Sequence, residues 1–141
     1  MNTDCVFCKI VAGELPAARV YEDTEILAFM DIGPVVKGHT LVIPKTHYDP
    51  ITRTPQAMLQ KLIVAVQRIA LAHIEGLGAD GVNVAQANGE SAGQIVPHIH
   101  FHVIPRFAND GHSFNWTPRQ YEQPEEMTRY AEKIRNALQA Q

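Results

Sequence analysis

The segment His98-Ile99-His100-Phe101-His102-Val103-Ile104 alternates histidines with apolar residues. Successive side chains of an extended strand point to opposite faces of a sheet. We therefore expect the three histidines to share one face, and Ile99, Phe101 and Val103 to share the other, which a sheet would bury. The pattern predicts a strand over 97–105 that presents three imidazoles in a row, each able to act as a nucleophile, acid, base or metal ligand.

Three interpretations of this row of histidines are open. The side chains could be polar positions on a solvated face, where threonine, lysine or glutamate is more usual. Two of them could bind a metal ion together with ligands from elsewhere. The central one, His100, could be a nucleophile that attacks phosphorus. Because strand residues rise by about 3.3 Å each, His98 and His102 lie about 13 Å apart, so one zinc ion cannot bind all three histidines.

The bulk properties of the chain limit the classes of function. Its 141 residues predict a single domain, 1–141. A net charge of −3 and the lack of a Lys/Arg run argue against nucleic-acid binding through a basic surface. No signal peptide and no segment like a membrane span is seen, so we expect a cytoplasmic protein without a membrane partner. In that reducing compartment Cys5 and Cys8 are typical of a metal-binding or redox pair rather than of a structural disulfide.

Helix and strand signals follow one another in groups along the chain. The expected elements are a helix over 5–12, strands over 18–21, 25–30 and 39–44, a long helix capped by Thr54 that runs to the glycines at 76 and 78, strands over 81–86 and 97–105, and a helix from Pro124 with a buried stripe of Met127, Tyr130, Ala131, Ile134 and Leu138. Because strands adjoin one another instead of alternating with helices, we predict an α+β fold with an antiparallel sheet.

The histidine segment and four further blocks resemble the signature of the histidine-triad (HIT) family of nucleotide hydrolases and transferases. The blocks are Cys5–Ile10, Phe29–Ile32, Gly38–Lys45 and Ala92–Gln94. The resemblance covers about residues 5–105, is loose over the tail 106–141, and is strongest to bacterial members of the Hint-like branch. It implies an antiparallel sheet of about five strands with the long helix packed on it, a C-terminal helix, and a homodimer that joins its sheets.

The same resemblance implies a site for a purine nucleotide. His100 would attack the α-phosphorus and form a nucleotidyl-histidine that water resolves, while His102 and His39 donate hydrogen bonds to phosphate oxygens. The other ring nitrogen of His100 needs an acceptor such as a backbone carbonyl to fix its tautomer. Asp31 matches the position that binds the ribose hydroxyls. The remaining nucleotide-binding candidates are Phe7, Ile10, Phe29 and Ile32 around the base, and Asn88 and Gln94 in the glycine-rich loop.

The favoured substrate is a purine nucleoside phosphoramidate, and two positions bear on this choice. Ile95 follows Gly93-Gln94 where active relatives commonly carry Ser or Thr, and Ala87 stands where Asn or Gln is common. We therefore expect the loop to bind a different leaving group, or to bind phosphate more weakly. A dinucleoside polyphosphate hydrolase, a nucleotidyl transferase and a nucleotide-binding scaffold with little activity remain alternatives.

Some bacterial HIT proteins are similar to this chain in a second respect, because they use two cysteines and two histidines to bind zinc. By that similarity Cys5, Cys8, His47 and His98 are the ligands of a structural zinc site. Four protein ligands leave no open position on the metal for catalysis. His73 and His112 have no predicted role.

Overall fold

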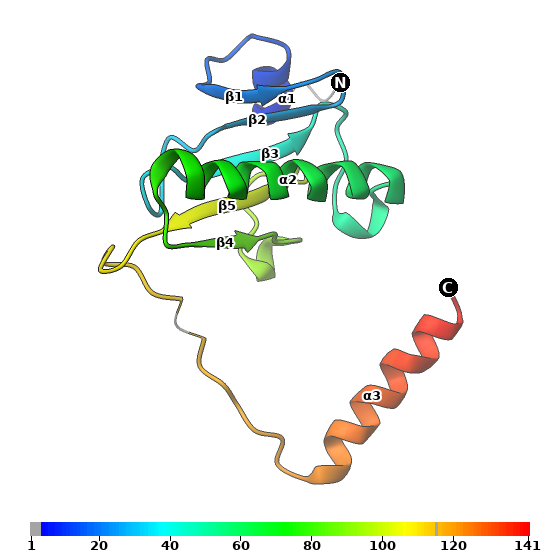
Figure 1. Ribbon diagram of the computed structural model, residues 1–141. Helices are drawn as coiled ribbons and strands as arrows, with labels where there is room; N and C mark the ends of the chain where they lie inside the picture. Colours follow the sequence, from blue (N-terminus) through cyan, green and yellow to red (C-terminus); the bar gives the residue numbers. More distant parts are fainter. Residues whose placement is uncertain (1–3, 115) are drawn as a thin grey trace.

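A computed structural model describes residues 4–114 and 116–141 and confirms the predicted α+β fold (Figure 1). Its five strands form one antiparallel sheet in the order β1-β2-β3-β5-β4. In chain order the elements are α1 (Val6–Val11), β1 (Arg19–Glu22), β2 (Ile26–Met30), β3 (Thr40–Pro44), α2 (Gln56–Leu77), β4 (Gly81–Ala85), β5 (Phe101–Arg106) and α3 (Pro124–Gln139), with 3-10 turns at Ile51–Arg53 and Glu90–Ala92.

The sheet has a hydrophobic cluster on each face, and the period-two alternation of strands decides which side chains join which cluster. On one face, residues of α2 pack with Ile99, Phe101 and Val103. On the other face, residues of α1 pack with Leu41 and Ile43 of β3. The prediction that the apolar side of the histidine segment is buried is therefore confirmed, and the histidines face the side that carries α1.

The strand that contains the histidines is shorter than predicted, since β5 begins at Phe101 rather than at Pro97. Pairing between β3 and β5 starts at Val42 with Phe101. Beyond that pair β3 ends at Pro44, which has no N–H to continue the ladder. The N–H of Ile99 instead donates to the carbonyl of Tyr48 at 2.7 Å. His98 and His100 therefore precede the strand and lie beside the segment that follows β3.

The start of α2 also differs from the prediction. The Thr54 hydroxyl donates to the carbonyl of Pro50 at 2.9 Å, so it does not cap the helix, and Pro55 occupies the N-cap position. The predicted glycine stop is confirmed, because Gly78 ends α2 with a φ of 69° in the left-handed region.

The composition of α2 corrects a second expectation. Its 22 residues are long and apolar enough to cross a membrane, although the sequence was expected to hold no such segment. The buried face of this helix, which includes Leu62 and Val66, packs on the sheet. Core packing accounts for this buried face only, because five apolar residues on the rest of the helix are 48–55% exposed: Ile63, Val64, Leu71, Ile74 and Leu77.

The C-terminal helix forms where predicted, but its apolar stripe is not buried. Along α3, all of which the structure describes, no residue is buried, and Met127, Tyr130, Ile134 and Leu138 are 55–60% exposed. The reason is the preceding segment, which runs away from the sheet and carries α3 with it (Figure 1). Helical periodicity identified the stripe correctly, but it could not show whether the chain's own core would cover it.

Candidate active site

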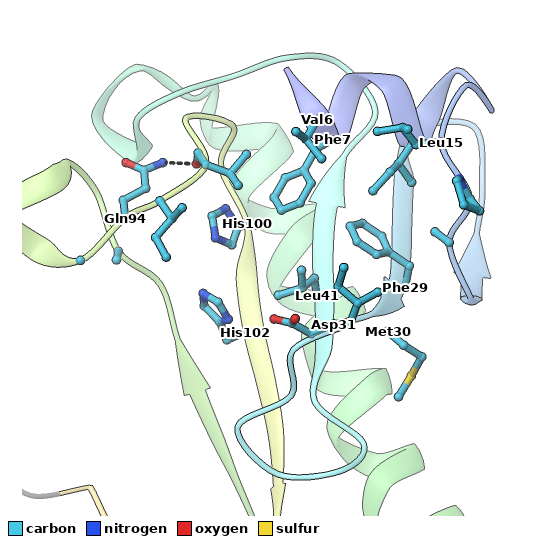
Figure 2. A pocket seen from close by; sticks show the side chains of 18 residues that line it. Val6, Phe7, Leu15, Phe29, Met30, Asp31, Leu41, Gln94, His100 and His102 are labelled. Atoms are coloured by element: carbon cyan, nitrogen blue, oxygen red, sulfur yellow. Dashed lines mark hydrogen bonds between the residues drawn. The ribbon is translucent and has the colours of Figure 1, made fainter. Parts of the chain in front are cut away.

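A pocket of about 480 Å³ opens between α1, β2 and the histidine segment (Figure 2). The predicted site residues that line it are Phe7, Ile10, Phe29, Asp31, Ile32, Gln94, His100 and His102. Phe7 meets Phe29 and His100 edge-on, with ring centroids 5.5 and 5.1 Å apart. Phe7, Ile10 and Phe29 are buried as core residues as well as pocket wall, whereas Ile32 is 100% exposed at the rim. The pocket therefore joins an apolar wall to two imidazoles.

A backbone carbonyl determines the tautomer of His100. Its Nδ1 lies 2.7 Å from the carbonyl oxygen of His98. Because a carbonyl oxygen only accepts, Nδ1 carries the proton, and Nε2 keeps its lone pair. The ring is buried and lines the pocket. Nε2 is therefore the nitrogen that His100 can use as a nucleophile.

A chain of hydrogen bonds determines the tautomer of His102 in the opposite sense. The N–H of Val35 donates to Nδ1 of His39 at 3.1 Å, so the proton of His39 is on Nε2. That proton is donated to Nδ1 of His102 at 2.8 Å, which places the proton of His102 on its own Nε2. Burial, followed by repulsion from His100 and His39, lowers the pKa of His102 to about 4, and burial also lowers the pKa of His39. Both rings are neutral at pH 7, and His102 offers one N–H to the pocket that it lines.

His39 occupies a different position from the one expected. Its side chain is 2% exposed and is not among the described residues that line the pocket. Its Nε2 proton is used by His102, so His39 can act on a phosphate only through that neighbour. Asp31 lies beside the pair, with Oδ2 3.6 Å from His39 Nε2, while its Oδ1 accepts the Gly33 N–H at 2.8 Å. Asp31 keeps its place in the pocket lining.

The glycine-rich loop, residues 86–97 between β4 and the histidine segment, holds the side chains of Gln94 and Asn88 in hydrogen bonds within the protein. The Gln94 amide donates to Asp49 Oδ1 at 2.8 Å and to the Val96 carbonyl at 2.9 Å, and its oxygen accepts the Gly89 N–H at 2.7 Å. Asn88 accepts the Ile51 N–H at 2.8 Å and is not among the described residues that line the pocket. Gln94 therefore lines the pocket with its hydrogen bonds already made, and Asn88 fixes the loop from outside.

The four predicted metal ligands come together beside the pocket. The sulfur and nitrogen atoms of Cys5, Cys8, His47 and His98 all lie within 4.8 Å of one another. Cys5 Sγ is 3.3 Å from His98 Nδ1, and Cys8 Sγ is 3.4 Å from His47 Nδ1. Tetrahedral zinc with ordinary bond lengths separates a sulfur from a nitrogen ligand by roughly 3.5 Å. The spacing of these four donors therefore fits tetrahedral metal coordination.

The tautomer of His98 suits this role. Its Nε2 lies 2.8 Å from the carbonyl of Pro44 and so donates to it, which leaves the lone pair of Nδ1 for the cysteine side. Burial lowers the pKa of His98 to about 4, so the ring is neutral. Cys5 Sγ also accepts the Cys8 N–H at 3.2 Å, as the N-cap of α1.

The comparison with known families agrees with this geometry. The HIT domain model matches residues 12–109, most of the chain. The chain belongs to the HIT family. Among relatives of this HIT protein, the protein hit of Bacillus subtilis is 42% identical over 137 residues, 96% of this chain and 94% of the relative. The adenosine 5′-monophosphoramidase of Schizosaccharomyces pombe is 36% identical over 135 residues, 95% of this chain and 98% of the relative.

Solved structures share the fold of this HIT protein. The crystal structure of SMU.412c from Streptococcus mutans superposes with a TM-score of 0.91 at 40% identity, covering 98% of this chain and 87% of that one. A Zn-bound histidine triad family protein from Mycobacterium smegmatis has a TM-score of 0.75 at 50% identity, covering 82% of this chain and 84% of that one.

Several residues of the pocket were not identified from the sequence of this HIT protein. Leu41 lines the pocket and could have been found, because it lies in β3 two residues after His39, and side chains two apart in an extended chain share a face. Leu15 lines it from the loop after α1, where no periodicity applies. The Val35 N–H, which sets the tautomer of His39, comes from a loop backbone and leaves no side-chain signal.

Proposed function

We propose that this HIT protein hydrolyses purine nucleoside phosphoramidates through a covalent nucleotidyl intermediate on His100. The observation that carries the proposal is the pair of opposite tautomers in the pocket. The bond from His100 Nδ1 to the His98 carbonyl leaves Nε2 as a lone-pair nucleophile, and the bond from His39 to His102 leaves an N–H donor beside it. The two rings are neighbours, with centroids 4.9 Å apart.

The proposed reaction has two displacements at the α-phosphorus. In the first, a bond forms from His100 Nε2 to phosphorus as the bond from phosphorus to the amine nitrogen breaks, and the amine leaves with a proton taken from water. The His102 N–H donates to a phosphate oxygen as negative charge develops there. In the second, water attacks phosphorus, the bond to Nε2 breaks, and the water proton returns to solvent. The products are the amine and the nucleoside monophosphate.

The walls of the pocket support one nucleotide as the ligand. The apolar side formed by Phe7, Phe29 and Leu41 suits a base, and Asp31 is placed to accept hydrogen bonds from ribose hydroxyls. The net charge of −3 favours a single nucleotide over a nucleic-acid strand, and we expect a cytoplasmic protein without a membrane partner. The phosphoramidase activity named for the Schizosaccharomyces pombe relative is of the same kind.

A substrate panel tests this function. The wild-type chain and His100→Ala are each tested with three kinds of substrate. These are adenosine 5′-phosphoramidate, diadenosine polyphosphates, and a nucleotide with an added acceptor. We expect release of AMP from the phosphoramidate by the wild type alone. Preferred cleavage of the diadenosine compounds, preferred transfer to the acceptor, or AMP binding without turnover would each replace this proposal with the corresponding alternative.

We also propose that Cys5, Cys8, His47 and His98 bind a structural zinc ion. The sulfur and nitrogen spacings support it, and so does the zinc-bound relative from Mycobacterium smegmatis. When bound, the ion would cross-link α1 to the histidine segment instead of acting as a Lewis acid, because four protein ligands fill its coordination shell. Elemental analysis should find zinc in the wild type and in His112→Gln, and much less in Cys5→Ser. Full zinc content in Cys5→Ser would overturn the site.

A homodimer is the third proposal, and α3 supports it. Residues 107–141 are about a quarter of the chain, so a TM-score of 0.91 over 98% of the chain requires a similar position of α3 in the Streptococcus mutans protein. A helix with an exposed apolar stripe would not keep one position in water. We therefore propose that a second copy covers it. Light scattering should give a dimer for the wild type and for Asn136→Lys on the polar face, and a monomer for Ile134→Lys. A dimer of Ile134→Lys, or a monomeric wild type, would contradict this.

A further inference from the structure

The side of the pocket that the glycine-rich loop supplies is unlike the rest of the site. Gln94 lies on one side of His100, whereas Phe7, Leu15 and Phe29 lie on the other (Figure 2). If the base occupies the side with the two phenylalanines, the side of Gln94 is the part of the pocket that remains for the group leaving the phosphorus. The chemistry of the loop therefore decides which leaving groups fit.

The loop has few polar side chains to offer to a leaving group. The amide of Gln94 already makes three hydrogen bonds within the protein, and Asn88 is bonded to Ile51 and Gln86. The loop side chains that complete the pocket lining are Ala87, Ile95 and Val96. None of these three can donate a proton or accept a hydrogen bond through its side chain.

Ile95 is the most accessible of these apolar groups. Its side chain lines the pocket and is 91% exposed. A single exposed apolar residue is ordinary on a protein surface. At this place, however, a ligand that covers Ile95 removes apolar area from water, which favours binding in proportion to that area. A charged group that covers the same side chain gives up part of its hydration, and Ala87, Ile95 and Val96 offer it no polar partner in return.

We propose that Ile95, together with Ala87 in the same pocket lining, selects leaving groups that carry an uncharged apolar or aromatic substituent. This inference rests on the proposed function and names its substrate class. The displacement is the one written above. The P–N bond to the substituted amine breaks as His100 Nε2 bonds to phosphorus, and the proton of the departing amine comes from water, because the side chains of Ala87, Ile95 and Val96 carry none to give.

Paired substrates test this selectivity. The adenosine 5′-phosphoramidates of 2-phenylethylamine and of 1,2-diaminoethane present an aromatic and a charged substituent at the same distance from phosphorus. We expect the wild type to prefer the phenylethyl compound by about 10-fold in kcat/KM, the scale of one well-covered apolar contact. In Ile95→Ser the preference should fall to about 2-fold, with the change concentrated on the phenylethyl substrate.

A control variant and two contrary results make the outcome decisive. Val20→Ser makes a similar exchange at an exposed position outside the pocket lining, and it should keep the wild-type preference. Equal turnover of both substrates by the wild type, or the same preference in Ile95→Ser, would overturn the role of Ile95 and leave the proposed function standing. Hydrolysis of neither substrate would instead overturn the proposed function, and this inference with it.

Discussion

The histidine segment has a cysteine end, at His98, and a pocket end, at His100 and His102. The imidazoles of His98 and His100 carry their protons on opposite ring nitrogens. At the cysteine end, His98 donates from Nε2 to the Pro44 carbonyl and turns Nδ1 toward Cys5. At the pocket end, His100 donates from Nδ1 to the His98 carbonyl and keeps Nε2 free. Two residues of one type, on one face, thus suit the two different roles that we propose, metal ligand for His98 and nucleophile for His100. The carbonyl that accepts from each imidazole therefore decides which of its nitrogens is available for chemistry.

The two ends are also linked by a single residue. The His98 side chain belongs to the cysteine end, while its carbonyl oxygen accepts from His100 at 2.7 Å. Fixing the side chain of His98 therefore also fixes the acceptor that orients the nucleophile. The following changes separate the two ends or break the link between them.

The largest of these effects is expected from His102→Ala, which acts only at the pocket end. Loss of the N–H that we propose donates to a phosphate oxygen should lower kcat by about 10²- to 10³-fold. This is the range for removal of one hydrogen-bond donor to a developing negative charge. The zinc content should stay at the wild-type value, because His102 is not among the four clustered ligands. Steady-state kinetics and elemental analysis of one preparation measure both quantities. A loss of both zinc and activity would contradict the expectation that His102 acts at the pocket end alone.

A smaller effect on activity is expected from Cys8→Ser, which acts at the cysteine end. Removing one ligand should release the metal, lower the melting temperature, and reduce kcat by about 10- to 100-fold through the loosened His98 carbonyl. KM should change less, since the base and ribose contacts are elsewhere. Calorimetry and kinetics on the purified variant check this. Wild-type kcat in a zinc-free Cys8→Ser protein would disprove the link through His98.

The smallest effect is the part of the pH dependence of stability that comes from His102, at the pocket end. The pKa of His102 is lowered to about 4, from an ordinary value of 6.5, by burial and by its neighbours His100 and His39, while Asp31 opposes the shift. Between pH 6.5 and about 4, His102 therefore binds a proton in the unfolded chain but not in the folded chain. Stability from this group is complete above pH 6.5 and is lost as the pH falls toward 4.

The melting temperature should accordingly fall between pH 6.5 and 4, and it should fall less steeply in His102→Gln. His112→Gln, whose ring contacts Phe114 rather than the pocket histidines, serves as the control and should keep the wild-type slope. Thermal melts of the three proteins in matched buffers provide the comparison. Identical slopes in all three would remove His102 from the account of acid stability.

Much of this fold follows from local pattern, and the exceptions have physical causes. Apart from β5, the strands begin and end within one residue of the predicted positions, because period-two alternation and turn residues are local signals. The start of β5 at Phe101 depends on Pro44 in another strand, which no window around the histidines contains. The exposure of α3 depends on where the preceding segment leads, and periodicity carries no information on that.

The candidate site divides in the same manner. The spacing of Cys5 and Cys8 indicated a metal-binding or redox pair, and the similarity to zinc-binding HIT proteins added His47 and His98. The structure places the ligand atoms of all four residues in one cluster. The tautomer of His100 is set by the His98 carbonyl, two residues away, and a backbone carbonyl was the acceptor expected from the sequence. The tautomer of His102 is set by the side chain of His39, 63 residues away, so only the folded chain reveals it. The position of His39 behind His102 was missed for that reason.

The central claim is that Nε2 of His100 forms the covalent bond to phosphorus. The most direct measurement is a reaction with adenosine 5′-phosphoramidate that is stopped rapidly by an alkaline quench. The protein is then analysed by intact mass and by fragment mass spectrometry. We expect an adenylyl group on His100 that appears within the first turnover, decays as AMP accumulates, and is absent from His100→Ala. Turnover without any adduct at the earliest quench times, or an adduct on a different histidine, would contradict it.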